Sequence, residues 1–180
     1  SKKDILILYA DNPFIDQEII KNMVNLKKKN NSDIVLLAVN TNKKNEYGRI
    51  LLDKEDKVKK IVEFKDATND QKKVALCNSG IMLLKSEVLK KLIIKVRPRN
   101  KKKEYYLTDI IELANKNSFK VDYIKSNFLK TLGVNTKQEL AIAEECFQNT
   151  LREKFISEGV KLLDPKNVFF NHDTKIGKDV

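Results

Sequence analysis

The stretch Ile5-Leu6-Ile7-Leu8-Tyr9-Ala10-Asp11-Asn12-Pro13 opens with an apolar run and continues into a carboxylate, an amide and a proline. A continuous apolar run is typical of a strand buried on both faces of a parallel sheet, and we expect this strand to span Ile5 to Tyr9. Open α/β sheets bind their ligands at the carboxyl ends of their strands. The stretch therefore predicts an α/β fold with Asp11 at the edge where a ligand would lie.

The segments after this strand complete a strand–helix–strand unit. An apolar stripe predicts a helix from Ile15 to Lys28. The run from Ile34 to Val39 predicts a second buried strand. A unit of this kind implies a right-handed crossover and a parallel sheet.

The middle of the chain predicts a more varied set of elements. We expect a hairpin from 47–52 and 58–64, a strand over 74–84, helices over 86–95 and 107–116, and a strand over 119–124. The strand over 74–84 is interrupted by Asn78-Ser79-Gly80. A glycine at such a place permits a ligand to approach the backbone closely.

The last part of the chain has a different residue pattern from the segments before it. Thr136 and Glu139 form a capping box, and the helix that they open is expected to end near Ser157, with Gly159 as its stop. Its expected packed face consists of Leu140, Ala143, Cys146, Phe147, Leu151 and Phe155. Phe170 and Ile176, six residues apart and followed by Gly177, are compatible with at most the first turn of a hexapeptide β-helix.

Composition narrows the class of protein. The 180 residues are 41% hydrophobic and carry a net charge of +11, but the lysines are scattered and lack the interleaved aromatics that stack on bases. We therefore expect no nucleic-acid partner. No apolar run is long enough to span a membrane, no signal peptide opens the sequence, and two cysteines offer no disulfide framework. These features predict a cytoplasmic protein.

Asp11 and Asn135 together predict a metal site. Asn135 lies in the turn Gly133-Val134-Asn135, just before the capping box. One carboxylate and one amide oxygen suit a magnesium ion that also holds substrate phosphates. Simpler roles remain open at this point: Asp11 or Asn135 could cap a neighbouring helix, Glu63 could be a surface residue, and Tyr105 or Tyr106 could be a core aromatic.

Six motifs occur in a fixed order along the chain: 8–13, Tyr47-Gly48-Arg49-Ile50, the segment 61–68, Asn78-Ser79-Gly80-Ile81, the segment 104–109, and Gly133-Val134-Asn135. In this order they resemble the uridylyltransferase domain of the bacterial bifunctional N-acetylglucosamine-1-phosphate uridylyltransferase / glucosamine-1-phosphate acetyltransferase family. The resemblance runs from Ile5 to about Val180 and covers the C-terminal part of that domain. It implies a partial Rossmann-like nucleotidyltransferase sheet over 1–135, a linker helix over 136–159 and the start of a left-handed β-helix over 160–180.

The resemblance also implies roles for individual residues. The positions that hold magnesium are Asp11 and Asn135, and Asn135 also contacts substrate. Those that bind or line the pocket for the N-acetylglucosamine moiety are Gly48, Glu63, Asn78, Tyr106 and Thr108. Tyr9 and Ala10 lie under the nucleotide and sugar, and the family usually has glycine where this chain has Ala10.

The implied reaction is magnesium-dependent transfer of a uridylyl group from UTP to N-acetylglucosamine 1-phosphate. Its products are pyrophosphate and UDP-N-acetylglucosamine, a precursor of peptidoglycan and lipopolysaccharide. The sugar phosphate is itself the nucleophile, so no catalytic side chain is expected beyond the metal ligands. Two alternatives stay open: a related sugar-1-phosphate nucleotidyltransferase for another sugar, and a non-catalytic remnant or assembly module.

The glycine-rich loop that grips the triphosphate in this family has no counterpart among the five glycines of the chain. We therefore expect an internal fragment that is inactive alone, unless another chain supplies the missing part. The full-length family is trimeric, so a homo-oligomer is also expected. Without its usual neighbours, the strand over Ile5–Tyr9 and the strand over Ile34–Val39 are each expected to lie at a sheet edge.

Overall fold

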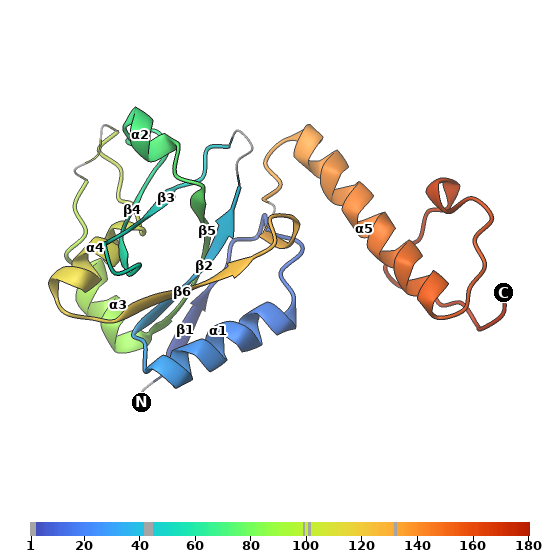
Figure 1. Cartoon of the computed structure of the whole chain (residues 1–180), viewed down its shortest axis with the longest axis horizontal. Helices are drawn as coiled ribbons and strands as arrows, with labels where there is room; N and C mark the ends of the chain where they lie inside the picture. The colour runs from blue at the N-terminus through green and yellow to red at the C-terminus, as the bar shows by residue number, and fades with distance from the viewer. Residues whose placement is uncertain (1–2, 42–44, 99, 101, 132) are drawn as a thin grey trace. The chain divides into compact units, whose positions relative to one another are not determined.

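A mixed β-sheet between helices forms the first part of the chain (Figure 1). The computed structural model describes residues 3–41, 45–98, 100, 102–131 and 133–180. The chain divides into unit 1, Ser1–Thr131, and unit 2, Leu132–Val180, and each is described by itself. In the described residues no helix is both long enough and apolar enough to cross a membrane.

Six strands of the described residues form the sheet of unit 1. Four of them follow the order β4 (Val58–Val62), β3 (Arg49–Leu52), β5 (Leu76–Lys85) and β2 (Ile34–Asn40), and β6 (Val121–Ser126) lies beyond β2. The remaining strand, β1 (Asp4–Ile7), pairs with the second half of β5. The predicted strands are all present, but β1 ends two residues earlier than expected.

The sheet is mixed, so the prediction of a parallel sheet is wrong. Both β1 and β2 run antiparallel to β5, and only β2 and β6 pair in parallel. The strands of the predicted strand–helix–strand unit therefore share a direction, but β5 lies between them. Because β1 and β2 are close in the sequence, they were expected to lie side by side. Instead, the ten-residue strand β5 pairs with both of them.

The two predicted buried strands differ in their surroundings. β2 lies between β5 and β6, and Ile34 to Val39 are at most 1% exposed, so the prediction of burial on both faces is confirmed. The expectation that this strand lies at a sheet edge is wrong, because β6 covers that side. β1 is only half-buried, with Asp4 exposed.

Helices cover both faces of the sheet (Figure 1). On one face Val35 and Leu37 pack with Ile19 and Met23 of α1 (Gln17–Asn30). On the other face the alternate residues of β2 pack with apolar residues of α3 (Ser86–Ile93) and α4 (Asp109–Lys116). The two-residue period of a strand therefore sends alternate side chains into two cores. The short helix α2 (Asn69–Lys72) has a capping box, Thr68 with Gln71, that sequence reasoning missed.

A register shift in β5 marks the centre of the sheet. Leu36 pairs with Met82, but Ala38 pairs with Asn78, so β5 has two extra residues at this point. Gly80 adopts a φ of +89° there, in the region that favours glycine. The Ser79 hydroxyl donates a hydrogen bond to the Leu37 carbonyl oxygen at 2.7 Å. The bulge therefore sets the backbone of Ser79-Gly80-Ile81 apart from the regular β2–β5 ladder.

Unit 2 contains α5 (Lys137–Ser157) and the segment after it. The predicted capping box of Thr136 and Glu139 is confirmed, and Gly159 ends the helix region with a φ of +98°. Of the predicted packed face, Phe155 packs in a small core with Val160 and Phe170, whereas Leu140 is 56% exposed. Among the described residues after α5 there is a 3-10 turn, Pro165–Asn167, and no strand. The start of a β-helix and the predicted domain boundaries stay predictions.

Candidate functional site

The loop between β1 and α1 carries the residues predicted to lie near a metal and a nucleotide. Tyr9 and Ala10 are exposed, and Asp11 is half-buried. Asp16 caps α1, because the Ile19 amide donates to its Oδ1 at 2.9 Å. The alternative role of Asp11 as helix cap is therefore wrong. Within the described residues the Asp11 carboxylate makes no hydrogen bond or ion pair, which leaves it able to accept a cation.

Asn12, the residue after Asp11, has a buried side-chain oxygen. Its Nδ2 donates a hydrogen bond to the Thr131 carbonyl oxygen at 3.2 Å, which orients the amide. Its Oδ1 is buried and has no hydrogen-bond partner in the part of the chain that the structure describes. A buried acceptor left unsatisfied is costly and calls for an explanation such as an absent ion or water.

The ring of Tyr9 lies against the backbone of Gly80. A Cβ at Gly80 would stand 2.2 Å from Tyr9 Cε2, closer than any real contact. The sequence predicted a close approach at this glycine, and the structure places the Tyr9 ring there. Partial burial of the ring, and secondarily the charges of Glu63 and Asp11, raise the pKa of Tyr9 above its ordinary value of 10.0. The hydroxyl therefore stays a protonated donor at neutral pH, within the field of both carboxylates.

Gly48 and Asn78 meet where β3 and β5 adjoin. The Asn78 amide donates a hydrogen bond to the Gly48 carbonyl oxygen at 2.8 Å. The Asn78 side chain is only 6% exposed, and its Oδ1 has no hydrogen-bond partner among the described residues. A buried amide oxygen of this kind would accept an N–H or O–H of a ligand.

Glu63 extends from the end of β4 to the same place. The Thr108 hydroxyl donates to Glu63 Oε1 at 2.7 Å, and a Cβ at Gly48 would lie 3.3 Å from Glu63 Oε2. Thr108 is buried at the start of α4 but gives that helix no side-chain cap, because its hydroxyl faces Glu63. The structure thus brings Gly48, Glu63 and Asn78 together, with Thr108 behind the carboxylate.

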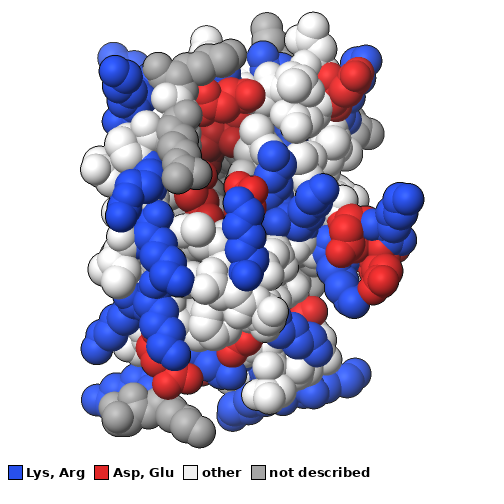
Figure 2. Space-filling view, turned by 90° about the vertical axis from the view of Figure 1, so that its left-hand side faces the viewer, with Lys and Arg blue, Asp and Glu red and all other residues white. Residues whose placement is uncertain are grey.

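A hollow lined with acidic residues adjoins Glu63. It has a volume of about 290 Å³, and its lining includes Glu63, Asp66, Tyr106, Asp109 and Glu112. Figure 2 shows one face of the molecule, on which acidic side chains gather in a recess. Burial, the Glu104 hydrogen bond and nearby carboxylates raise the pKa of Tyr106 to about 12. Burial and neighbouring carboxylates also raise the pKa of Asp109. Tyr106 therefore remains a neutral hydroxyl that faces the hollow.

Asn135 belongs to unit 2, whereas the other predicted site residues belong to unit 1. Its side chain is exposed, and its backbone amide donates to Glu139 Oε2 at 2.8 Å. Thr136 is the cap of α5, so Asn135 is not needed for that role. Over the described ranges no group of three or more His, Cys, Asp or Glu side chains could hold a metal. The pairing of Asp11 with Asn135 stays a prediction.

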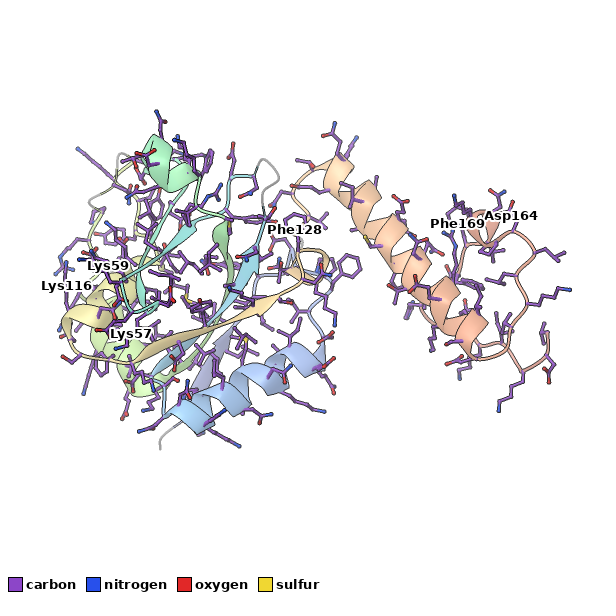
Figure 3. All side chains as sticks on the ribbon, in the orientation of Figure 1. Lys57, Lys59, Lys116, Phe128, Asp164 and Phe169 are labelled. Carbon is purple, nitrogen blue, oxygen red and sulfur yellow. The ribbon has the colours of Figure 1, made fainter. Side chains whose placement is uncertain are left out.

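Lysines are spread over the surface of unit 1, and several pair locally with acids. Lys57 bonds with Glu55 at 2.6 Å, and Lys116 bonds with Glu112 at 2.8 Å. Figure 3 shows both lysines, with Lys59, at the end of unit 1 away from Phe128. Phe128 makes an edge contact with the ring of Tyr47, the residue before Gly48, with ring centroids 6.2 Å apart.

Sequence reasoning missed one cation close to the site: Arg49, a charged residue inside a short apolar strand.

A mixed sheet between helices, with ligand-facing groups at its strand ends, is the architecture of nucleotide-handling α/β enzymes. Residues 1–150 match the family described as nucleotidyl transferase, and the chain belongs to that family. Two solved structures share the fold. The first is apo UDP-glucose pyrophosphorylase, with a TM-score of 0.54 and 17% sequence identity; the match covers 68% of this chain and 46% of that one. The second is 4-diphosphocytidyl-2C-methyl-D-erythritol synthase from Anaerococcus prevotii, with a TM-score of 0.53 and 15% sequence identity; the match covers 82% of this chain and 59% of that one.

The curated relatives belong to a narrower group than the nucleotidyl transferase family as a whole. Bifunctional protein GlmU from Paramagnetospirillum magneticum is 39% identical over 178 residues, which cover 98% of this chain and 39% of that protein. The GlmU proteins of Rhodospirillum rubrum and Buchnera aphidicola are 39% and 38% identical, over 98% and 99% of this chain. The chain spans 40% and 39% of their respective lengths. The resemblance inferred from the six ordered motifs is therefore confirmed.

Proposed function

We propose that the chain carries the sugar-binding part of a uridylyltransferase that joins UTP and N-acetylglucosamine 1-phosphate. The observation that carries this proposal is the buried Oδ1 of Asn78, which has no partner among the described residues. It lies on the strand beside Gly48 and so next to the Glu63 carboxylate. Two acceptors on residues that both adjoin Gly48 favour a ligand rich in N–H and O–H donors, such as an acetamido sugar.

Each residue has a distinct part in this proposal. Glu63 accepts hydrogen bonds from sugar hydroxyls, and Asn78 accepts from the acetamido N–H or a hydroxyl. Gly48 leaves room for the Glu63 carboxylate, because a Cβ there would lie 3.0 Å from Ile61 Cγ2 and 3.3 Å from Glu63 Oε2. Tyr9 adds a neutral hydroxyl that lies within the field of Glu63 and Asp11. These residues orient the sugar phosphate, which is the reacting nucleophile, so the main contribution of the protein is positioning.

The residues near Asp11 fit a magnesium ion. The half-buried carboxylate of Asp11 and the unsatisfied amide oxygen of Asn12 belong to consecutive residues, and both are the hard oxygen donors that magnesium prefers. Asp11 would hold the ion, with Asn135 as the second ligand expected from the family resemblance. When bound, magnesium would neutralise phosphate charge and stabilise the charge that develops during transfer.

A related nucleotidyltransferase for another sugar is the second candidate. Ala10, where the family usually has glycine, favours it, because an added methyl group could alter which sugar nucleotide fits. A comparison of affinities for sugar 1-phosphates with and without the acetamido group separates the two candidates.

For unit 2 we propose the role of connector. The α5 helix would link the transferase part to a left-handed β-helix that begins near Val168, because Phe170 and Ile176 both pack on the same small core. The trimer known for the family would form through that β-helix. Unit 2 would then serve assembly rather than sugar binding.

Calorimetric titration of the chain with UDP-N-acetylglucosamine and magnesium tests the proposed function. We expect saturable binding that Asp11→Ala weakens about tenfold and Glu63→Ala abolishes. Glu55→Ala is the matched control, because this glutamate lies between β3 and β4 and its side chain is 72% exposed. A folded chain that binds no sugar nucleotide would support a non-catalytic module instead.

A further inference from the structure

Arg49 is a buried cation whose partners all lie beside the sugar-binding residues. Its side chain is only 4% exposed, although it stands in β3 directly after Gly48. Within the described residues it makes no ion pair with a carboxylate. A buried charge without such a partner is costly unless hydrogen bonds compensate it. We propose that Arg49 is the positioning residue of the sugar subsite, holding Gly48, Glu63 and Asn78 in one arrangement; this rests on the function proposed above.

The first group of contacts holds the turn before Gly48. Arg49 Nη1 donates to Asn45 Oδ1 at 2.8 Å and also to the Tyr47 carbonyl oxygen. Nη2 donates to the Asn45 carbonyl oxygen at 3.4 Å. The guanidinium therefore fastens both ends of the turn from which Gly48 emerges, with the planar set of donors that only arginine offers.

The second group of contacts reaches β5 and α2. Arg49 pairs with Cys77 in the sheet register, and its Nη1 donates to the Cys77 Sγ at 3.3 Å. Burial raises the pKa of the Cys77 thiol, so the sulfur stays neutral beside the guanidinium. The Arg49 Nε donates to the Lys72 carbonyl oxygen at 3.3 Å. Cys77 immediately precedes Asn78, so this contact holds the strand at the residue before the unsatisfied amide.

The third contact is with an aromatic ring. The Arg49 guanidinium carbon lies 5.1 Å from the centre of the Phe64 ring, and the Lys72 ammonium lies 4.9 Å from it. Cations at this distance are attracted to the ring face. Phe64 immediately follows Glu63, so the ring anchors the end of β4 from which the carboxylate projects.

The three groups of contacts share one pattern. Each group includes a contact with the immediate sequence neighbour of a sugar-site residue: Tyr47 beside Gly48, Phe64 beside Glu63, and Cys77 beside Asn78. Arg49 does not itself need to touch the sugar. It sets the geometry of the three residues, and misplacement of binding groups by about 1 Å can cost on the order of a hundredfold in function.

Arg49→Lys and Arg49→Met test this role in the 180-residue chain, with N-acetylglucosamine 1-phosphate as the probe. We expect both variants to bind the probe at least about tenfold more weakly. Lysine should not rescue binding, because one ammonium cannot reach Asn45, Lys72 and Cys77 together. Arg152→Met is the matched control, since Arg152 is also buried, donates to the Val168 and Lys166 carbonyls and lies over the Phe169 ring, but belongs to unit 2.

Amide hydrogen exchange in the free protein gives a readout that needs no ligand. The Asn78 amide, bonded to the Gly48 carbonyl, should exchange about tenfold faster in both Arg49 variants, while amides of the β2–β6 ladder keep their protection. Asn45→Ala removes one acceptor of the Arg49 guanidinium and should weaken probe binding about threefold. Because Asn45 lies in a loop, this variant still tests the proposal if Arg49→Met does not fold.

The outcomes separate the two proposals. Unchanged probe affinity and unchanged Asn78 exchange in Arg49→Lys would overturn the positioning role. Equal weakening of probe binding by Arg152→Met would also overturn it, since the effect would then be general destabilisation. If the wild-type chain binds no sugar phosphate, the proposed function fails, and the Asn78 exchange alone then decides whether Arg49 holds the three residues together.

Discussion

The sugar end and the metal end of the candidate site are built differently. At the sugar end, Gly48 and Glu63 adjoin the ends of β3 and β4, Asn78 lies in β5, and Thr108 and Arg49 hold these segments. At the metal end, Asp11 lies in a loop, and the described residues give its carboxylate no hydrogen bond or ion pair. Its neighbour Asn12 has one hydrogen bond and one unsatisfied oxygen. Strand ends can orient binding groups in advance, whereas the loop holds its donors with fewer contacts.

This contrast suggests that sugar recognition and metal binding are separable. A preorganised subsite loses little conformational entropy on binding, so its affinity should persist without the metal. Tyr9 is linked to both ends, because the charge of Glu63 at the sugar end and the charge of Asp11 at the metal end both raise its pKa. The predictions below test whether the two ends behave independently, and whether Tyr9 couples them.

The largest effect is expected at Glu63. Glu63→Gln should weaken binding of N-acetylglucosamine 1-phosphate about a hundredfold, because it removes charge-assisted hydrogen bonds to sugar hydroxyls. In EDTA, Asp11→Asn should change this affinity less than about twofold, since no metal is there to lose. Calorimetry without magnesium measures both values. A large loss in Asp11→Asn under these conditions would contradict the separation of the two ends.

Gly80→Ala should disrupt the contact through which Tyr9 is held. The new Cβ would lie 2.2 Å from Tyr9 Cε2, on a backbone with a φ of +89°. We expect a loss of at least about 2 kcal/mol in the free energy of unfolding, measured by denaturant titration. The double variant Tyr9→Ala/Gly80→Ala should recover part of this loss, because only the backbone cost then remains. No recovery would show that the ring contact is unimportant.

Magnesium removal should weaken binding of UDP-N-acetylglucosamine by about tenfold in the wild type. In Asp11→Asn the affinities with magnesium and with EDTA should be the same, because the ligand for the ion is gone. Calorimetric titrations in the two buffers give the comparison. A magnesium effect that survives in Asp11→Asn would place the ion elsewhere.

The smallest effect concerns the loop that carries Asp11. Asp16 caps α1 and bonds with Lys130 at 2.7 Å, and these hydrogen bonds lower the pKa of Asp16 below its ordinary value of 3.8. Asp16→Ala should lower the free energy of unfolding by about 1 kcal/mol, whereas Asp16→Asn keeps a capping oxygen and should lose little. A lowered pKa in the folded state means that the stabilisation is present above pH 3.8 and is lost as the pH falls through the native pKa.

The difference between the wild type and Asp16→Ala should therefore shrink below about pH 4, as measured by urea unfolding at several pH values. A difference that does not change with pH would mean that the charge of Asp16 contributes nothing.

The apolar pattern of the sequence was enough to predict every strand and most helices. It could not predict that β5 separates β1 from β2, because this depends on pairing between residues far apart in the chain. The ordered motifs indicated Gly48, Glu63 and Asn78 as site residues, and the structure brings these three together. Arg49 was missed because a charged residue in a short strand is usually solvent-facing, and only the tertiary structure shows that its guanidinium is buried.

Comparison of N-acetylglucosamine 1-phosphate with glucose 1-phosphate tests the central claim most directly. The two ligands are titrated by NMR into the ¹⁵N-labelled 180-residue chain. We predict at least about tenfold tighter binding of the acetamido sugar, with the largest shifts at the Gly48 and Asn78 amides, because the simpler sugar leaves the buried Asn78 oxygen unsatisfied. Equal affinities, or shifts confined to other parts of the chain, would contradict the assignment of these residues to an N-acetylglucosamine subsite.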